Sequence, residues 1–218
     1  MKNDRDSYFS YAAHKLLTRI TAISGYAQGL EHEITAPEKA GSMILNECEL
    51  LTEEIDKLIS VAQLDYVQPP SKLVPVPLIE VLENCIDRFS AAGKKKGLSL
   101  TLEKSADEIC ALGTEQYIEE ILDNLLSNAI RYAKSGLFIT VHTEGERALL
   151  TVADDGDGIR EEDLPYIFDR FYKGPGGNFG LGLSIARDAA ERMNGTLTAA
   201  NRPEGGAILT LELGLYRT

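Results

Sequence analysis

The residues of this chain that are best suited to chemistry are two asparagines one helical turn apart. Asn124 and Asn128 lie in the stretch Glu119–Tyr132, whose sequence EEILDNLLSNAIRY has the apolar spacing of a helix. Residues four apart share one face of a helix, so their two amide oxygens lie near each other. Such oxygens are the hard ligands that Mg²⁺ prefers. On the same helix, Arg131 can meet a phosphate oxygen and Tyr132 can lie against a purine ring.

Two glycine-containing turns follow this helix, and each could hold part of a nucleotide. Asp154 ends a predicted strand and opens the run Asp-Asp-Gly-Asp-Gly, in which Gly156 and Gly158 allow a turn with positive φ. A buried aspartate at this turn can accept a hydrogen bond from the amino group of adenine. The second turn consists of Gly180, Leu181, Gly182 and Leu183 and opens a predicted helix. The free N–H groups at the start of that helix can bind phosphates. No GxxxxGK[ST] loop is present, which excludes a P-loop enzyme.

Each of these signals is weak alone, because acidic-glycine turns are common on surfaces and the helix equally fits a plain amphipathic core helix. In combination they resemble the ATP-binding domain of sensor histidine kinases, a branch of the GHKL superfamily. Asn124–Ala129 matches the asparagine box of that family, and Asp154–Gly158 matches its first glycine box. Residues 180–183 match the second glycine box, and Ile167–Lys173 matches the phenylalanine box of the mobile lid.

The resemblance implies ATP and Mg²⁺ as cofactors and gives roles to particular residues. Asn128, with Asn124 beside it, would hold Mg²⁺, and Asp154 would bind adenine. Lys173 or Arg170 would contact the phosphates.

A histidine far upstream indicates the branch of the superfamily. The stretch from Phe9 to Thr18, FSYAAHKLLT, resembles the phosphoacceptor box of the same kinases and places His14 at the acceptor position. A neutral imidazole nitrogen can attack the γ-phosphorus in line while Mg²⁺ spreads the developing charge. The resemblance then implies transfer of the phosphoryl group to an aspartate in the receiver domain of a response regulator.

The acceptor box departs from the family pattern at the position after the histidine. The family has Glu or Asp there to accept the proton of the ring, whereas this chain has Lys15, a cation that cannot accept one. We therefore expect autophosphorylation that is slower than the family norm, with Lys15 attracting the γ-phosphate instead. Thr18 lies one turn below His14, where the family uses Thr or Asn to orient the water that dephosphorylates the partner.

The two other histidines are weaker candidates for the acceptor. His32 lies five turns after His14 and is followed by Glu33, but Pro37 ends the helix shortly beyond it. His142 falls within a predicted strand, which favours a structural role.

Two runs with alternating steps of four and three predict a pair of long amphipathic helices. The first contains Phe9, Ala13, Leu16, Ile20, Ile23, Ala27, Leu30 and Ile34. The second contains Ile44, Cys48, Leu51, Ile55, Leu58 and Ala62. The short connection, with Pro37 beginning the second helix, predicts an antiparallel hairpin. A lone hairpin leaves apolar surface uncovered, so we expect two chains to form a four-helix bundle as a homodimer.

Prolines at 69, 70, 75 and 77 mark a linker with a short edge strand, and the periodicity changes after them. The remaining chain predicts helices marked by residues 79–89, 119–132 and 183–193, and strands at 98–102, 110–112, 138–142, 148–152, 196–200 and 207–213. We therefore predict an α+β protein with three regions: a dimerisation and phosphotransfer hairpin at 1–67, a linker at 68–77 and an α/β sandwich of the GHKL type at 78–218.

Composition excludes some partners and indicates a compartment. The net charge of −12 argues against nucleic acid. No apolar run approaches the roughly 20 residues of a membrane span, and no signal peptide is visible. The three widely spaced cysteines are expected to be buried free thiols in a reducing compartment. We expect a cytoplasmic chain without membrane contact of its own, which could be the cytoplasmic part of a membrane-anchored sensor.

Two other functions stay open at this stage. One is a GHKL ATPase of the gyrase or mismatch-repair type, against which the helical hairpin and His14 argue. The other is a degenerate kinase that acts as a binding or phosphatase-only module, which Lys15 and Arg19 in the acceptor box favour and the intact nucleotide motifs oppose. The sequence reveals neither the stimulus nor the cognate regulator.

Overall fold

The structure is a computed structural model, and the chain forms two compact units, residues 1–65 and 66–218. The structure describes residues 2–32, 34, 36–66, 72–170, 172 and 181–217. The side chains of residues 2–12, 14, 53, 54 and 56–66 lie outside this description.

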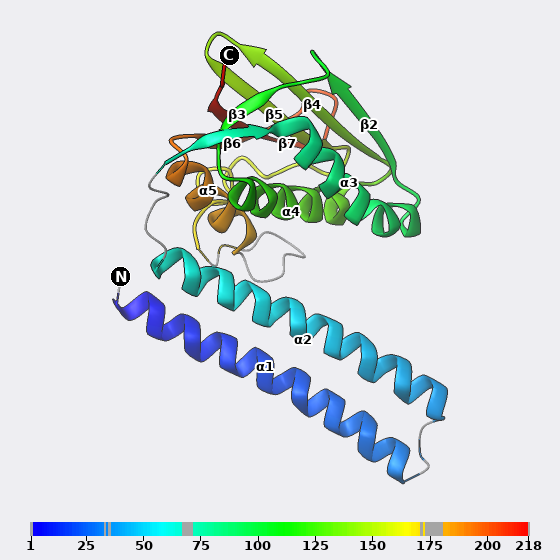
Figure 1. The fold of residues 1–218 in the computed structure, drawn as a ribbon. Coiled ribbons are helices and arrows are strands. Elements are labelled where there is room, and N and C mark those ends of the chain that lie inside the picture. The colour runs from blue at the N-terminus through cyan, green and yellow to red at the C-terminus, as the bar shows by residue number, and fades with distance from the viewer. Residues whose placement is uncertain are drawn as a thin grey trace. The chain divides into compact units, whose positions relative to one another are not determined.

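The first unit is an antiparallel pair of long helices, α1 (Lys2–Glu31) and α2 (Pro37–Tyr66), as Figure 1 shows. Arg19 on α1 pairs with Glu47 on α2 at 2.9 Å, and Ala40 is fully buried near the start of α2. Pro37 begins α2, as the sequence predicts, because its fixed φ suits the first turn of a helix. The predicted first run reaches Ile34, but α1 ends at Glu31 and Ile34 is 79% exposed.

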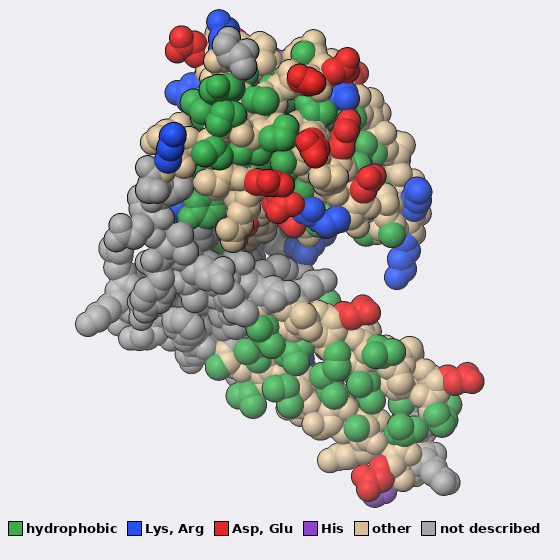
Figure 2. Space-filling view, in the orientation of Figure 1, with side chains coloured by type: hydrophobic (Ala, Val, Ile, Leu, Met, Phe, Trp, Pro, Cys, Tyr) green, Lys and Arg blue, Asp and Glu red, His purple; other side chains and the backbone are tan. Residues whose placement is uncertain are grey.

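Much of the apolar surface of this hairpin stays open to solvent. Figure 2 shows green side chains gathered along the helices, and the exposed ones in the described part include Leu17, Ile20, Leu30, Leu45 and Ile55. Cys48 is exposed on the same hairpin, whereas Cys85 is buried and Cys110 half-buried. The expectation of buried thiols is therefore wrong for Cys48, because one hairpin alone does not cover the outer face of α2.

The second unit is built on a mixed five-stranded sheet in the order β2-β4-β5-β7-β6. Its strands are β2 (Ser99–Lys104), β4 (Gly136–Glu144), β5 (Arg147–Asp154), β6 (Thr196–Asn201) and β7 (Ala207–Gly214). β2 pairs with β4 in parallel, and the other neighbours are antiparallel. A separate two-stranded ribbon joins β1 (Val74–Pro77) to β3 (Cys110–Gly113).

Three helices pack against one face of the sheet: α3 (Leu78–Lys95), α4 (Glu115–Tyr132) and α5 (Gly182–Arg192), as Figure 1 shows. α4 lies between the other two and places Ile121, Leu122 and Leu125 in the core with no exposed surface. The facing strand residues alternate, so that Ile139, Val141 and Leu150 are buried while their neighbours on the strand are partly exposed. The core thus fixes α4 by its apolar face and leaves its polar face available.

The predicted α+β class, with a helical hairpin ahead of a sandwich, is confirmed. Predicted strand ends agree within two residues: β4 extends two residues beyond the predicted 138–142 at both ends, and β2 ends at Lys104 rather than Leu102. Residues 74–77 of the predicted linker form β1 and pair with β3. None of the helices, over the residues described, is long and apolar enough to cross a membrane.

Candidate nucleotide site

The asparagine helix α4 places its amides on the face turned away from the core. Asn124 and Asn128 are both half-buried, next to the fully buried Leu125. The Asn124 Nδ2 donates to the carbonyl oxygen of Glu120 at 2.8 Å, and Oδ1 lies next to Gly182. No residue of the described part of the chain forms a hydrogen bond with the Asn128 side chain. Its amide is therefore available to an external ligand.

Asp154, at the end of β5, is a buried carboxylate with one satisfied oxygen. It is 3% exposed, and its Oδ1 accepts N–H groups from Gly156 at 2.8 Å and Ala207 at 3.4 Å. Among the described residues no donor reaches Oδ2. Burial raises the pKa of this carboxyl, and the two backbone N–H groups oppose that shift. A buried acceptor left without a donor is costly unless a ligand supplies one.

The first glycine turn packs directly against the end of α4. A methyl group at Gly156 would overlap the carbonyl oxygen of Tyr132 and lie 2.8 Å from Asp154 Oδ1. Gly158 has φ +78°, as predicted, but Gly156 is not in the positive-φ region. The predicted reason for Gly156 is therefore wrong: glycine is needed there because two chain segments approach closely.

The second glycine turn packs against the same helix at Asn124. A methyl group at Gly182 would lie 2.7 Å from Asn124 Oδ1, so the first residue of α5 sits against the asparagine side chain. Leu181 is 1% exposed and anchors the start of α5, and Leu183 is half-buried. The first N–H groups of a helix have no partner within the helix, and those of α5 therefore begin next to Asn124. Gly180 lies outside the described residues.

Arg131 and Tyr132 end the asparagine helix beside the first glycine turn. Arg131 is half-buried and Tyr132 is 39% exposed. The Lys96 ammonium group donates to the carbonyl oxygens of Ile130 and Arg131 at 2.8 and 2.7 Å, which fixes this end of α4. The three motifs, separated in sequence, thus converge on one helix.

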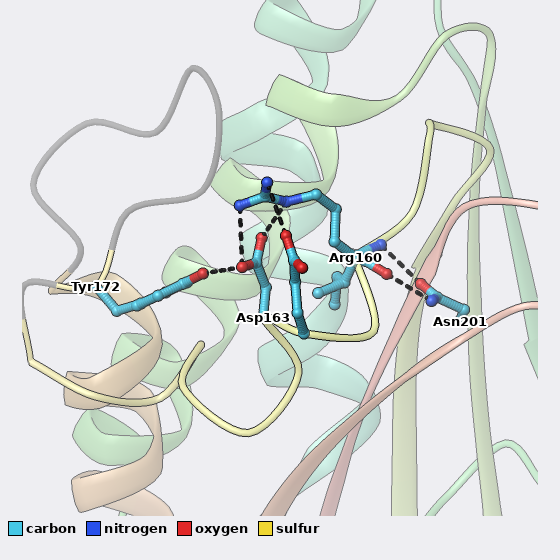
Figure 3. Close-up of polar contacts among 6 residues, drawn as sticks. Arg160, Asp163, Tyr172 and Asn201 are labelled. Atoms are coloured by element: carbon cyan, nitrogen blue, oxygen red, sulfur yellow. Dashed lines mark hydrogen bonds and ion pairs between the residues drawn. The ribbon is translucent and has the colours of Figure 1, made fainter.

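The segment after the first glycine turn is held by a buried carboxylate. Asp163, 6% exposed, accepts two hydrogen bonds from Arg160 at 2.7 and 3.0 Å and one from the Tyr172 hydroxyl, as Figure 3 shows. The Arg160 bonds, followed by that of Tyr172, hold the pKa of Asp163 below its usual range. Arg170 pairs with Asp188 of α5 at 2.7 Å. Lys173 lies outside the described residues.

Asp155, to which the sequence assigned no role of its own, ties the glycine turn to the start of β4. Its carboxylate accepts the N–H groups of Lys134 at 2.8 Å and Ser135 at 3.0 Å, and the Ser135 hydroxyl at 2.5 Å. The Ser135 hydroxyl, with the backbone groups after it, lowers the pKa of Asp155. Its position directly after Asp154 was the available signal, but only the fold brings residues 134 and 135 next to it.

The predicted phosphoacceptor lies on α1 of the first unit. The side chain of His14 is outside the described residues, whereas Lys15 is half-buried and Thr18 is exposed. His32 lies just after the end of α1 and is exposed, and His142 is in β4 as expected.

Comparison with known proteins agrees with this geometry. Residues 113–217 match the family described as histidine kinase-, DNA gyrase B- and HSP90-like ATPase. BaeS of Escherichia coli (strain K12), a signal transduction histidine-protein kinase, is 30% identical over 98% of this chain and 47% of its own length. AfsQ2 of Streptomyces coelicolor is 30% identical over 92% of this chain and 40% of its own length. The chain thus spans about half, or less, of these curated relatives.

Solved structures show the same arrangement of elements. The Acinetobacter baumannii histidine kinase AdeS superposes with a TM-score of 0.75 at 25% identity, covering 94% of this chain and 98% of that one. The fold and the site define a GHKL-type ATP-binding domain in the second unit. With the relatives that span both units, the chain is identified as the catalytic core of a sensor histidine kinase.

Proposed function

We propose that this chain uses Mg-ATP to phosphorylate His14 and then passes the phosphoryl group to an aspartate of a response-regulator receiver domain. The observation that carries the proposal is the buried Asp154, whose Oδ2 lacks a donor within the described residues. The amino group of adenine would supply that donor, whereas guanine carries a carbonyl oxygen at the same position. The site therefore fits an adenine nucleotide.

The polar face of α4 fits the metal and phosphate end of the nucleotide. Asn128 offers an unengaged amide oxygen for Mg²⁺, with Asn124 Oδ1 one turn away. The start of α5, adjacent to Asn124, offers N–H groups to the phosphate oxygens. Arg131, Arg170 and Lys173 are the cations that we assign to the remaining phosphate charge. Magnesium, when bound, would neutralise charge that develops on the transferred phosphoryl group.

His14 is proposed as the nucleophile because α1 carries it within the family's phosphoacceptor pattern. Its neutral ring nitrogen would form the N–P bond as the bond to the ADP oxygen breaks, after which a base removes the ring proton. Thr18 follows one turn later and is exposed, where its hydroxyl could orient a water for dephosphorylation of the regulator.

We further propose that the hairpin forms a homodimer. Leu17, Ile20, Leu45 and other large apolar side chains of the hairpin are at least one-third exposed in a single chain. Their burial against a second hairpin would provide the association energy, since removing apolar area from water is favourable. A monomeric mass by light scattering at micromolar concentration would contradict this.

The kinase proposal is tested by incubating the full chain with γ-labelled ATP and Mg²⁺. The expected result is label on the protein that is stable in alkali, labile in acid and absent from His14→Gln. Free phosphate without protein label would instead indicate an ATPase of another branch. A His32→Gln variant serves as the matched control, because His32 lies beyond the end of α1 and should leave the label intact.

A further inference from the structure

Two residues at the connection between β6 and β7 form hydrogen bonds to the two ends of the first glycine turn. Asn201, the last residue of β6, uses its side-chain amide to bind both backbone groups of Ile159. Its Oδ1 accepts the Ile159 N–H at 2.7 Å and its Nδ2 donates to the Ile159 carbonyl oxygen at 2.6 Å, as Figure 3 shows. One side chain thus satisfies both backbone polar groups of a loop residue that belongs to no strand.

Gly158 is shaped to this contact. Its φ of +78° suits glycine, and a methyl group there would lie 2.8 Å from Asn201 Oδ1. The backbone at Gly158 and the Asn201 amide are therefore in close contact, and a displacement of either one requires the other to move.

Arg202 holds the opposite end of the same loop. Its Nη1 donates to the backbone carbonyl oxygen of Asp154 at 3.0 Å, and its guanidinium lies over the Phe138 ring, with Cζ 4.2 Å from the ring centroid. Stacking on an aromatic face restrains the planar guanidinium and so its donor direction. Directly after the turn, Ala207 at the start of β7 supplies the N–H that binds Asp154 Oδ1.

We propose that Asn201 and Arg202 are positioning residues that set the direction of the Asp154 carboxylate and thereby the preference for adenine over guanine. This rests on the proposed function, in which Asp154 binds adenine. Neither side chain needs to touch the nucleotide. They act by fixing the two ends of the loop 154–159, one at the Asp154 carbonyl and the other at Ile159.

The location of the two residues makes the proposal separable from an effect on folding. Asn201 is exposed on an edge strand and Arg202 is half-buried, so their truncation opens no cavity in the core. The Asn201 bonds end on Ile159 in the loop, and the Arg202 bond ends on Asp154, the last residue of β5, so their loss should be felt first at Asp154 and the loop that follows it.

The test measures binding of Mg-ATP and Mg-GTP to the full chain by calorimetry, for the wild type, Asn201→Ala and Arg202→Met. We expect each variant to weaken ATP binding about tenfold while GTP binding stays unchanged, because one or two modest hydrogen bonds are lost. Asn201→Asp keeps an acceptor for the Ile159 N–H but loses the donor, so it should recover part of the preference. Circular dichroism confirms that each variant is folded.

Matched controls come from similar residues away from the loop. Arg217→Met removes an arginine that donates to the backbone carbonyl oxygen of Gly145 at 2.6 Å, at the other end of β5. Asn84→Ala removes an exposed asparagine on α3. Both should keep the wild-type preference for ATP.

Two results would overturn the inference in different ways. Unchanged binding, or equal loss of ATP and GTP binding in folded variants, would show that Asn201 and Arg202 do not set base preference. A wild-type chain that binds no ATP would overturn the proposed function itself, and this inference with it.

Discussion

The ammonium group of Lys96 lies 2.7 Å from the carbonyl oxygen of Arg131, across the 35 residues that separate them in sequence. It also binds the preceding carbonyl at Ile130 and thereby closes the C-terminal end of the asparagine helix. Carbonyl groups in the last turn of a helix lack partners within the helix, and a cation there also complements the helix dipole. The helix that carries the proposed magnesium ligands is thus capped by a residue from the end of another helix.

Lys96→Met should therefore destabilise the second unit by about 1 kcal/mol, because two carbonyl groups lose a charged donor. Urea unfolding followed by circular dichroism measures the change. Lys95→Met is the matched control: the residue is exposed in the last turn of α3 and it is Lys96, not Lys95, that binds the carbonyl groups of α4, so its loss should cost clearly less. Equal losses in the two variants would mean that the cap does not stabilise α4.

Asp154→Asn should weaken ATP binding without lowering the folding stability of the nucleotide-free chain. Burial raises the pKa of Asp154, so its ionised form is disfavoured in the folded chain. The native state therefore binds the proton of Asp154 more tightly than the unfolded state does. The ionised carboxylate lowers the free energy of unfolding by its full amount above the raised pKa, and this loss of stability disappears as the pH falls through that pKa. The neutral amide should therefore leave the nucleotide-free chain as stable as the wild type, or more stable, at pH 7.

The same substitution should weaken ATP binding by about tenfold or more, because the acceptor for the adenine amino group loses its charge. Calorimetry with Mg-ATP and a thermal melt without nucleotide give the two readouts. Loss of stability together with retained ATP affinity would contradict the assigned role.

Asp155 should show the opposite pH dependence. Its pKa is lowered, chiefly by the Ser135 hydroxyl, so its contribution to stability is present above the ordinary aspartate pKa of about 4 and is lost as pH falls toward the lowered value. Asp155→Ala should thus lower the melting temperature at pH 7, and the deficit should narrow steadily in acid. A deficit that is constant with pH would show that the charge of Asp155 is not responsible. Asp157→Ala, at an exposed position two residues on, is the control.

Periodicity predicted the elements well where packing follows a simple repeat. The run of apolar residues in α4 and the alternation in β4 and β5 are set by burial on one face, and the structure has them as expected. The C-terminal ends of β2 and β4 were each placed two residues short, since the last two residues of both strands are exposed and extend no buried alternation.

Contacts between distant segments were beyond the reach of the sequence. Lys96 directly follows the last residue of its own helix, yet its side chain caps α4. Asn201 ends β6 and Arg202 follows it in an ordinary turn, and only the pairing of β7 with β5 brings them to the loop after Asp154. The reason for Gly156 was likewise set by the approach of Tyr132, which local sequence does not encode.

Gly182→Ala should disturb the amide end of the site. The added methyl group would lie 2.7 Å from Asn124 Oδ1, so the asparagine side chain has to turn away from the start of α5. We expect ATP affinity to fall several-fold with little loss of stability, because the obstructing atom ends a movable side chain. Fluorescent nucleotide titration measures the affinity. Gly93→Ala in α3 is the control: it meets no atom within 4 Å and should stabilise the chain by about 0.5–1 kcal/mol.

Lys15→Glu tests the departure of the phosphoacceptor box from its family pattern. A carboxylate next to His14 could accept the ring proton and orient the imidazole, which a lysine cannot do. We expect the rate of autophosphorylation to rise about tenfold or more, at the low end of what general base catalysis contributes. Lys15→Met separates the two effects of the change, because it removes the positive charge without adding an acceptor and should not raise the rate. If the Glu variant were no faster than the wild type, or if Met and Glu gave the same gain, proton acceptance at this position would not limit the reaction.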